Sequence, residues 1–222
     1  MKFKSPSRTV ILGILIFAGV TYLIAWSPVF SVRDIETIGL PAGISAPAIT
    51  AKTDIAIGEK LSRIEPRAIE RNLQEISWIS HVAIHRNWIS GKVGIEITPR
   101  IPVGIFSGRA IDATGTLFEY PGKLPPGLPV VTANSPSLGL AAVSLFTHLP
   151  TSLQDQTDSV NASGESAIAS IMNIAGRQVK ITWGSSDQID LKVTVLKALL
   201  ELPENKSVQR IDLSAPHAPI VK

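Results

Sequence analysis

An uncharged apolar run near the N-terminus constrains this chain more than any other feature. Residues 9–26 read TVILGILIFAGVTYLIAW. As a helix the run would extend roughly 27 Å at ~1.5 Å per residue, close to the ~30 Å hydrocarbon thickness of a bilayer. Lys2, Lys4 and Arg8 precede the run, and the next charge after it is Arg33. Because short flanks rich in Lys and Arg tend to stay in the cytoplasm, the sequence predicts a single transmembrane helix with its N-terminus inside.

A cleaved signal peptide is the alternative interpretation of this run. The apolar part of such a peptide is usually about 7–15 residues long and is followed by small residues at the cleavage site. Here the run is longer, and it contains Tyr22 and ends in Trp26, which are typical of interfacial anchors. We therefore expect an uncleaved type II anchor in the cytoplasmic membrane, with residues 1–8 as a cytoplasmic tail and an extracytoplasmic body.

The composition of the body excludes several classes of function. The chain has 21 Lys and Arg against 18 Asp and Glu, and the three basic residues before the apolar run account for the difference. A nucleic-acid surface needs a clustered basic face, so we expect no nucleic-acid partner for a neutral body. The chain has no cysteine, which excludes disulfides, thiol nucleophiles and Cys-ligated zinc. The roughly 190 residues of the body suit two small domains better than one.

Residues 27–99 predict a compact α+β domain. The elements follow one another as strand, helix, helix, strand, strand, with a strand-like run at 32–38, a short helix at 45–53, a helix at 65–76, and alternating strands at 79–86 and 93–97. The helix at 65–76 has Ala68, Ile69, Leu73 and Ile76 at helical spacing. This order predicts helices on one face of a small sheet.

Residues 100–222 predict a β-rich domain with a mixed sheet and flanking helices. We expect short strands at 103–106, 110–112 and 116–118, a proline-rich loop at 121–129, a helix at 138–149, a hairpin at 167–173 and 178–183, a helix ending near Leu202, and strands at 208–213 and 218–221. Asp190 is the expected cap of the helix that ends near Leu202. The polar residues 151–165 lack spaced apolar positions, so we expect a loop or a short irregular strand there.

Several of these segments resemble one known family. In the first domain they are residues 32–39, the turn at 58–61, ISWI at 76–79 and VAIHRNW at 82–88. These resemble the POTRA domain found in the FtsQ/DivIB family of bacterial cell-division proteins. The similarity continues through the second domain at RIPVG (100–104), IDATGTLF (111–118), LPVV (128–131) and IDL (211–213) with Pro216. It covers nearly the whole chain, and it rests on order and spacing.

Three positions depart from the family pattern. Ser77 stands where a proline often precedes the tryptophan, Ile89 replaces a common proline, and Pro99 replaces an acidic residue. Proline has no backbone N–H to donate, so Pro99 should end the third strand and stiffen the joint between the domains.

The sequence offers little catalytic chemistry. His81 and His85 are four residues apart but fall in an alternating strand pattern without an acidic or cysteine partner, so we interpret them as surface histidines. Asp112 in the segment DATG predicts a β-turn held by its carboxylate, because a second copy for an aspartic-protease dyad is missing. The sequence contains no G-x-S-x-G, P-loop or H-E-x-x-H motif. We expect no enzymatic activity, no cofactor, no metal and no small-molecule substrate. Trp78 and Trp88 are most simply core or domain-edge aromatics, and an exposed tryptophan would be a good interaction hot spot.

Recognition through the backbone is the remaining possibility. The chain closes with a strand followed only by Lys222, and we expect that strand at the edge of its sheet, where unpaired N–H and C=O groups can bind another chain. Side chains alternate along a strand, so one of Ile220 and Val221 should face inward and the other outward. The resemblance implies that this region receives a segment of a small single-pass partner of the FtsB/DivIC type, which travels with FtsL. The candidate contacts are Ala218, Ile220 and Val221, with Ile211 and Leu213 on the adjacent strand.

Two functions of different classes follow. The first, implied by the resemblance, is a non-enzymatic scaffold of the divisome that acts at the division septum. The alternative is a membrane-anchored POTRA protein that serves secretion or outer-membrane assembly.

Overall fold

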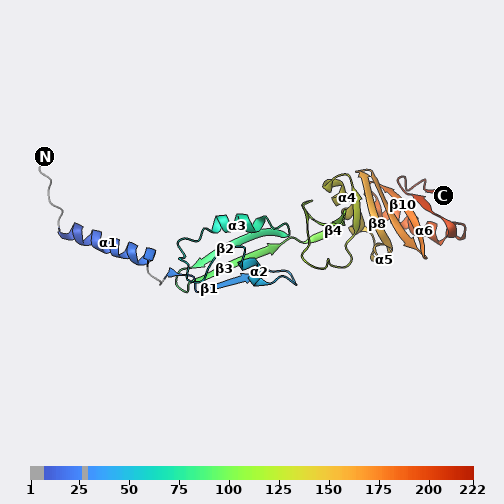
Figure 1. The fold of residues 1–222 in the computed structure, drawn as a ribbon. Helices are drawn as coiled ribbons and strands as arrows, with labels where there is room; N and C mark the ends of the chain where they lie inside the picture. Colours follow the sequence, from blue (N-terminus) through green and yellow to red (C-terminus); the bar gives the residue numbers. More distant parts are fainter. Residues whose placement is uncertain (1–7, 27–29) are drawn as a thin grey trace, which may run out of the picture. The chain divides into compact units, whose positions relative to one another are not determined.

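The computed structural model describes residues 8–26 and 30–222, and the chain divides into two compact units, Met1–Pro99 and Arg100–Lys222 (Figure 1). The predicted cytoplasmic tail lies outside the described residues except for Arg8. Helix α1 (Arg8–Trp26) coincides with the apolar run, and its residues from Arg8 to Leu23 are exposed. Within the described part of the chain, no helix meets the combined length and hydropathy that crossing a bilayer requires.

The first unit has the predicted order of strand, helix, helix, strand, strand. Its elements are β1 (Asp34–Ile38), α2 (Ala46–Thr50), α3 (Pro66–Gln74), β2 (Ile79–Asn87) and β3 (Lys92–Pro99). The sheet order is β1-β3-β2, in which β1 runs parallel and β2 antiparallel to β3. Pro99 is the last residue of β3, as predicted.

Buried and exposed side chains alternate along β2 and β3, so one face of this small sheet is covered and the other is open. The apolar residues at alternate positions of these strands are buried, and α3 lies against β2 and α2 against β1. The buried apolar residues are Val82, Ile84, Val93, Ile95 and Ile97 from the sheet, Ile49 from α2, and Ile69 and Leu73 from α3. Trp78 is also buried, which makes it a core aromatic. The open face carries His85, Gly94 and Glu96, which are exposed or partly exposed.

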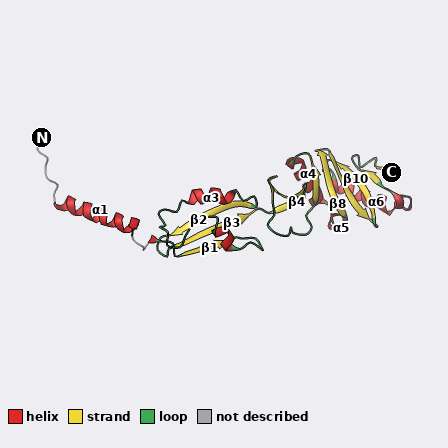
Figure 2. Cartoon of the chain, viewed as in Figure 1, coloured by secondary structure: helices red, strands yellow, loops and turns green. Residues whose placement is uncertain are grey.

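The second unit is built on one nine-stranded mixed sheet flanked by helices, as the sequence predicts (Figure 2). Its strands are β4 (Pro102–Phe106), β5 (Arg109–Asp112), β6 (Leu117–Phe118), β7 (Val130–Ala133), β8 (Thr157–Gly164), β9 (Ala167–Ile174), β10 (Arg177–Gly184), β11 (Arg210–Asp212) and β12 (Ile220–Val221). The helices are α4 (Pro136–His148), α5 (Thr151–Gln154), α6 (Ile189–Glu201) and the 3-10 helix η2 (Pro203–Ser207). The sheet order is β12-β11-β10-β9-β8-β7-β4-β5-β6, with parallel pairs at β4/β7, β7/β8 and β10/β11.

A buried polar pair fixes the middle of this sheet. Trp183 of β10 has no exposed surface, and its indole N–H donates a hydrogen bond to Ser170 Oγ of β9 at 2.9 Å. The bond satisfies both polar groups inside an apolar core, where an unpaired donor would be costly. Ser170 lies between its strand partners Val160 of β8 and Ile181 of β10, which are both fully buried.

Two predictions for the second unit are wrong. Residues 151–165 contain helix α5 and the complete strand β8, which lies at the centre of the sheet. The buried side chains of β8 are Val160 and Ala162, and pairing with β7 and β9 holds the strand in place despite its polar composition. Asp190 is not the cap of α6. Gln188 takes the N-cap position with a left-handed backbone (φ 53°). Asp190 lies in the first turn, where a carboxylate interacts favourably with the positive end of the helix dipole.

Gly139 of α4 provides a test of this packing. A Cβ at this position would approach Cδ2 of Phe106 to 2.6 Å, which is closer than real contacts allow. We expect Gly139→Ala to lower the free energy of unfolding by roughly 1–2 kcal/mol in a urea titration, because overpacking outweighs the ~1 kcal/mol gain in helix propensity. Gly164→Ala is the control, since its Cβ would have an ordinary contact of 3.7 Å. Equal stabilities of the two variants would contradict the assigned packing of Phe106.

Candidate functional site: the open sheet edge at β12

Strand β12 forms one edge of the nine-stranded sheet. It pairs with β11 alone, in antiparallel register, with Ile211 opposite Val221 and Asp212 opposite Ile220 (the C-terminal end in Figure 1). The register beyond the strand is fixed by Arg210 and Lys222, which exchange both main-chain hydrogen bonds at 2.9 and 3.0 Å. The structure therefore places the final strand at an edge.

The register decides which main-chain groups face away from the sheet. Along an antiparallel pair, hydrogen-bonded and non-hydrogen-bonded residue pairs alternate. Arg210 and Lys222 form a hydrogen-bonded pair, so Ile211 and Val221 form a non-hydrogen-bonded pair. The N–H and C=O of Val221 therefore point to the open side of the sheet, whereas those of Ile220 point toward β11.

The side chains of β12 alternate as the sequence predicts. Ile220 is 55% exposed, whereas Val221 is partly buried and packs against the domain core. An added strand would therefore meet the main chain of Val221 and the side chain of Ile220. Ala218 is exposed and lies in the turn before β12, where its N–H donates to the carbonyl of Ala215.

The two candidate residues on and just after β11, Ile211 and Leu213, lie inside the domain rather than on its surface. Ile211 and Leu213 are fully buried and belong to the core cluster of the second unit. The N–H of Leu213 also donates to Thr182 O of β10 at 2.7 Å. Both residues can therefore support β12 from within the sheet, but their side chains are out of reach of a partner on the surface.

A charged turn borders this edge. Asp212 Oδ1 accepts hydrogen bonds from the hydroxyl of Ser214 at 2.7 Å and from its backbone N–H at 2.9 Å. These bonds, with the charge of Lys222, lower the pKa of the Asp212 carboxyl below its ordinary value. The carboxylate thus stays ionised, and its hydrogen bonds to Ser214 fix the turn that follows β11.

The opposite edge of the same sheet is closed by a side chain. Asp112 N–H donates to Thr116 O, so the neighbouring residue Leu117 presents its main chain to the outside of β6. The guanidinium of Arg109 already donates to the Leu117 carbonyl at 3.1 Å. On the edge strand β2 of the first unit, the carboxylate of Glu70 similarly accepts from the N–H of Ile84 at 3.2 Å. Protective contacts of this kind discourage strand addition, and Val221 has none among the described residues.

The candidate catalytic or metal-binding residues His85, His148 and Asp112 make local contacts within their own units. His85 Nε2 lies 3.6 Å from Glu96 on the open face of the first sheet, and His148 Nδ1 contacts the carbonyl of Ser144. Within residues 8–26 and 30–222, no three His, Asp or Glu side chains gather in a way that could hold a metal ion. Asp112 forms the predicted turn, because its Oδ1 accepts from Thr114 and from the N–H of Thr116.

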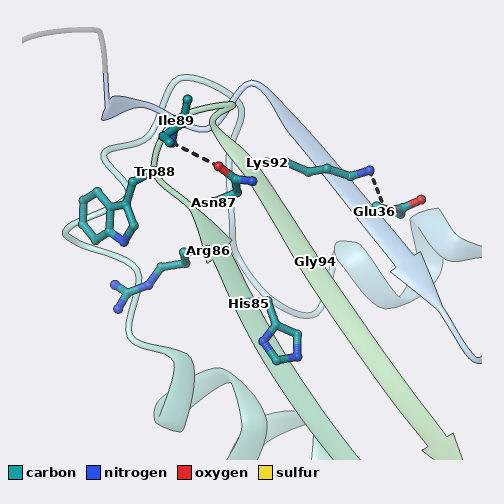
Figure 3. A pocket seen from close by; sticks show the side chains of 8 residues that line it. All are labelled: Glu36, His85, Arg86, Asn87, Trp88, Ile89, Lys92 and Gly94. Atoms are coloured by element: carbon teal, nitrogen blue, oxygen red, sulfur yellow. Dashed lines mark hydrogen bonds and ion pairs between the residues drawn. The ribbon is translucent and has the colours of Figure 1, made fainter.

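A surface hollow of about 540 Å³ on the first unit was not predicted (Figure 3). Gly94 leaves its floor without a side chain, and a Cβ there would only just touch His85 at 3.8 Å. Its walls include an ion pair between Lys92 and Glu36 at 2.6 Å and the turn that carries Trp88 and Ile89. A glycine at an outward position of an alternating strand is the sequence signal that could have indicated it.

Comparisons with known proteins agree with both units. Residues 30–100 match the family described as POTRA domain, FtsQ-type, and residues 102–214 match the family described as Cell division protein FtsQ/DivIB, C-terminal. A cell division protein FtsQ from Streptomyces griseus is 29% identical over 86% of this chain and 96% of its own length. Cell division proteins FtsQ from Mycobacterium bovis and Corynebacterium glutamicum are 26% and 25% identical, over 99% and 91% of this chain and 69% and 92% of their own lengths.

Proposed function

This chain belongs to the FtsQ/DivIB family of cell-division proteins, and on that premise we propose that it is a non-enzymatic scaffold of the divisome. In this role it binds FtsB/DivIC-like and FtsL-like division proteins through its extracytoplasmic domains during septum formation. It needs no cofactor, metal, small-molecule substrate or nucleic acid for this function.

The open edge at β12 is the observation that carries the proposal. The outward N–H and C=O of Val221 offer hydrogen bonds to an added strand, and the exposed side chain of Ile220 lies beside them. Strand addition supplies affinity through main-chain bonds and specificity through alternate side chains. The partner-binding segment therefore comprises Ala218, Ile220 and Val221, with Ile211 and Leu213 beneath it.

The proposal includes a single-pass type II topology. Residues 1–8 lie in the cytoplasm, residues 9–26 cross the cytoplasmic membrane, and residues 27–99 and 100–222 form the extracytoplasmic POTRA and β domains. Support comes from residues 9–23 of α1, which are uncharged and exposed, and from Lys2, Lys4 and Arg8, which precede them. A scaffold of this topology links division proteins on the two sides of the membrane.

Localisation in dividing cells tests the proposed function. We expect a fluorescent fusion to the N-terminus of the full chain to form a band at mid-cell when constriction begins, because a divisome scaffold is recruited to the septum. The same fusion carrying Val221→Pro reports whether recruitment needs the β12 edge. A uniform distribution around the envelope of constricting cells would instead favour the alternative, a membrane-anchored POTRA protein of secretion or outer-membrane assembly.

A further inference from the structure

Exposed apolar side chains gather at the end of the first unit where the chain arrives from α1. Ile89 is 92% exposed and Trp88 is 38% exposed, and both lie in the turn between β2 and β3. Ile57 is 65% exposed and precedes Gly58, whose N–H donates to the carbonyl of Val32. Soluble surfaces tolerate scattered apolar residues, but three at one end of a small domain indicate a surface that is covered by something.

The β2–β3 turn is held rigidly beside Phe30, Ser31 and Arg33, which follow α1 along the chain. The ring of Trp88 packs edge-on against Phe30 with centroids 6.2 Å apart. The carbonyl of Gly91 accepts a hydrogen bond from the N–H of Arg33 at 2.8 Å, and a Cβ on Gly91 would meet Ser31 O at 2.6 Å. Only glycine allows this close approach, so the turn and the arriving chain form one fixed corner.

The local geometry of the turn keeps Ile89 pointing outward. Asn87 Oδ1 accepts from the backbone N–H groups of Ile89 and Ser90 at 3.1 and 3.0 Å, which closes an Asx turn. Figure 3 shows Ile89 at the tip of this turn and Trp88 beside it. The guanidinium of Arg86 donates to the carbonyls of Leu61 and Ile64 at 3.0 and 2.9 Å and lies 5.4 Å from the centre of the Trp88 ring, so it helps to hold that ring in place.

The short connection between α1 and Phe30 keeps this corner close to the end of α1. Helix α1 ends at Trp26, and three residues separate it from Phe30. Four Cα steps span at most about 14 Å, whatever the orientation of the unit. The interfacial zone on each side of a bilayer's hydrocarbon core is itself several ångströms thick, and tryptophan concentrates there.

We infer that the corner formed by Trp88, Ile89 and Ile57 docks on the phospholipid surface of the membrane that holds α1. This inference rests on the proposed anchor. The exposed apolar side chains enter the interfacial zone, and the contact fixes the tilt of the first domain. The β12 edge belongs to the other unit and takes no part in this contact.

Single-cysteine labelling of the full chain tests the inference, because the protein has no cysteine of its own. Ile89→Cys carries an environment-sensitive fluorophore at the corner. Ser80→Cys is a nearly isosteric control at an exposed position near the other end of β2, about 24 Å from Asn87 along the strand. Ile16→Cys reports on α1. The proteins are reconstituted in phosphatidylcholine and phosphatidylglycerol vesicles, with and without a phosphatidylcholine that bears a nitroxide near its headgroup.

We expect the Ile89 label to emit at shorter wavelength and to be quenched by the nitroxide lipid, while the Ser80 label does neither and the Ile16 label remains in the hydrocarbon. If Ile16 is in the hydrocarbon but Ile89 behaves as Ser80 does, the inference is wrong and the anchor stands. A wavelength shift at Ile89 without quenching would also overturn it, because protein rather than lipid would then cover the corner. If the Ile16 label stays in water, the anchor fails and the inference fails with it.

Discussion

Replacing Val221 with proline is expected to weaken capture of an FtsB-type partner by roughly 10- to 100-fold. Val221 presents its N–H to the open side of β12, and proline removes that donor without a change of charge. A partner carbonyl left unpaired at a buried contact costs about 1–3 kcal/mol. The measurement is a pull-down or binding titration with the full chain in detergent or nanodiscs.

Val221→Ala is the matched control for this experiment. Alanine also loses the partly buried side chain but keeps the N–H, so it should bind far better than the proline variant. Proline at position 220 would be less informative, because the N–H of Ile220 faces β11 and its loss would open the sheet itself. Equal partner capture by Val221→Pro and Val221→Ala, with both proteins folded, would count against strand addition at this edge.

Asp112→Ala is expected to lower the free energy of unfolding of the second unit by about 2–4 kcal/mol at pH 7. The carboxylate is nearly buried, and it accepts hydrogen bonds from Thr114, from Thr116 N–H, and from Arg100 at 2.7 Å. Charge-assisted bonds are each worth about 1.5–3 kcal/mol, and truncation leaves the guanidinium of Arg100 without this carboxylate. Urea unfolding of the variant and of an exposed control, Asp158→Ala, measures the difference.

The pH dependence of this effect has a definite sign. Burial alone would raise the pKa of Asp112, but the hydrogen bonds from Thr114, Arg100 and Thr116 outweigh it and lower the pKa below its ordinary value. A carboxyl with a lowered pKa in the folded state contributes stability above its unfolded pKa and loses it as the pH falls through the folded pKa. The difference between the wild type and Asp112→Ala should therefore shrink below about pH 4. A difference that is constant from pH 7 to pH 3 would contradict this role.

The sequence pattern correctly predicted those elements that depend on interactions between residues close together in the chain. Alternation gave β2 and β3, and the hairpin of β9 and β10 turns at Ala175 and Gly176, which both adopt positive φ (50° and 80°). The turn at Asp112 was predicted from the side chain that forms it. In each case the decisive interactions lie within a few residues along the chain.

The remaining features depend on neighbours that are distant in sequence. Strand β8 carries Asp158 and Asn161 on exposed positions, and only its place between β7 and β9 makes it a strand. The sequence correctly placed the final strand at an edge, but it could not show that Ile211 and Leu213 lie beyond a partner's reach. The direction of the Val221 N–H follows from the register with β11, which alternation does not specify.

The distance between β12 and β4 has a mechanical consequence. Six strand spacings of about 4.8 Å separate them, so the β12 edge lies roughly 29 Å from the strand that follows Arg100. A partner's strand would become a tenth member of the sheet, and any load on it would pass sideways through every ladder of hydrogen bonds to β4. The sheet would then act as a rigid spacer that sets the distance between β4 and the bound partner strand.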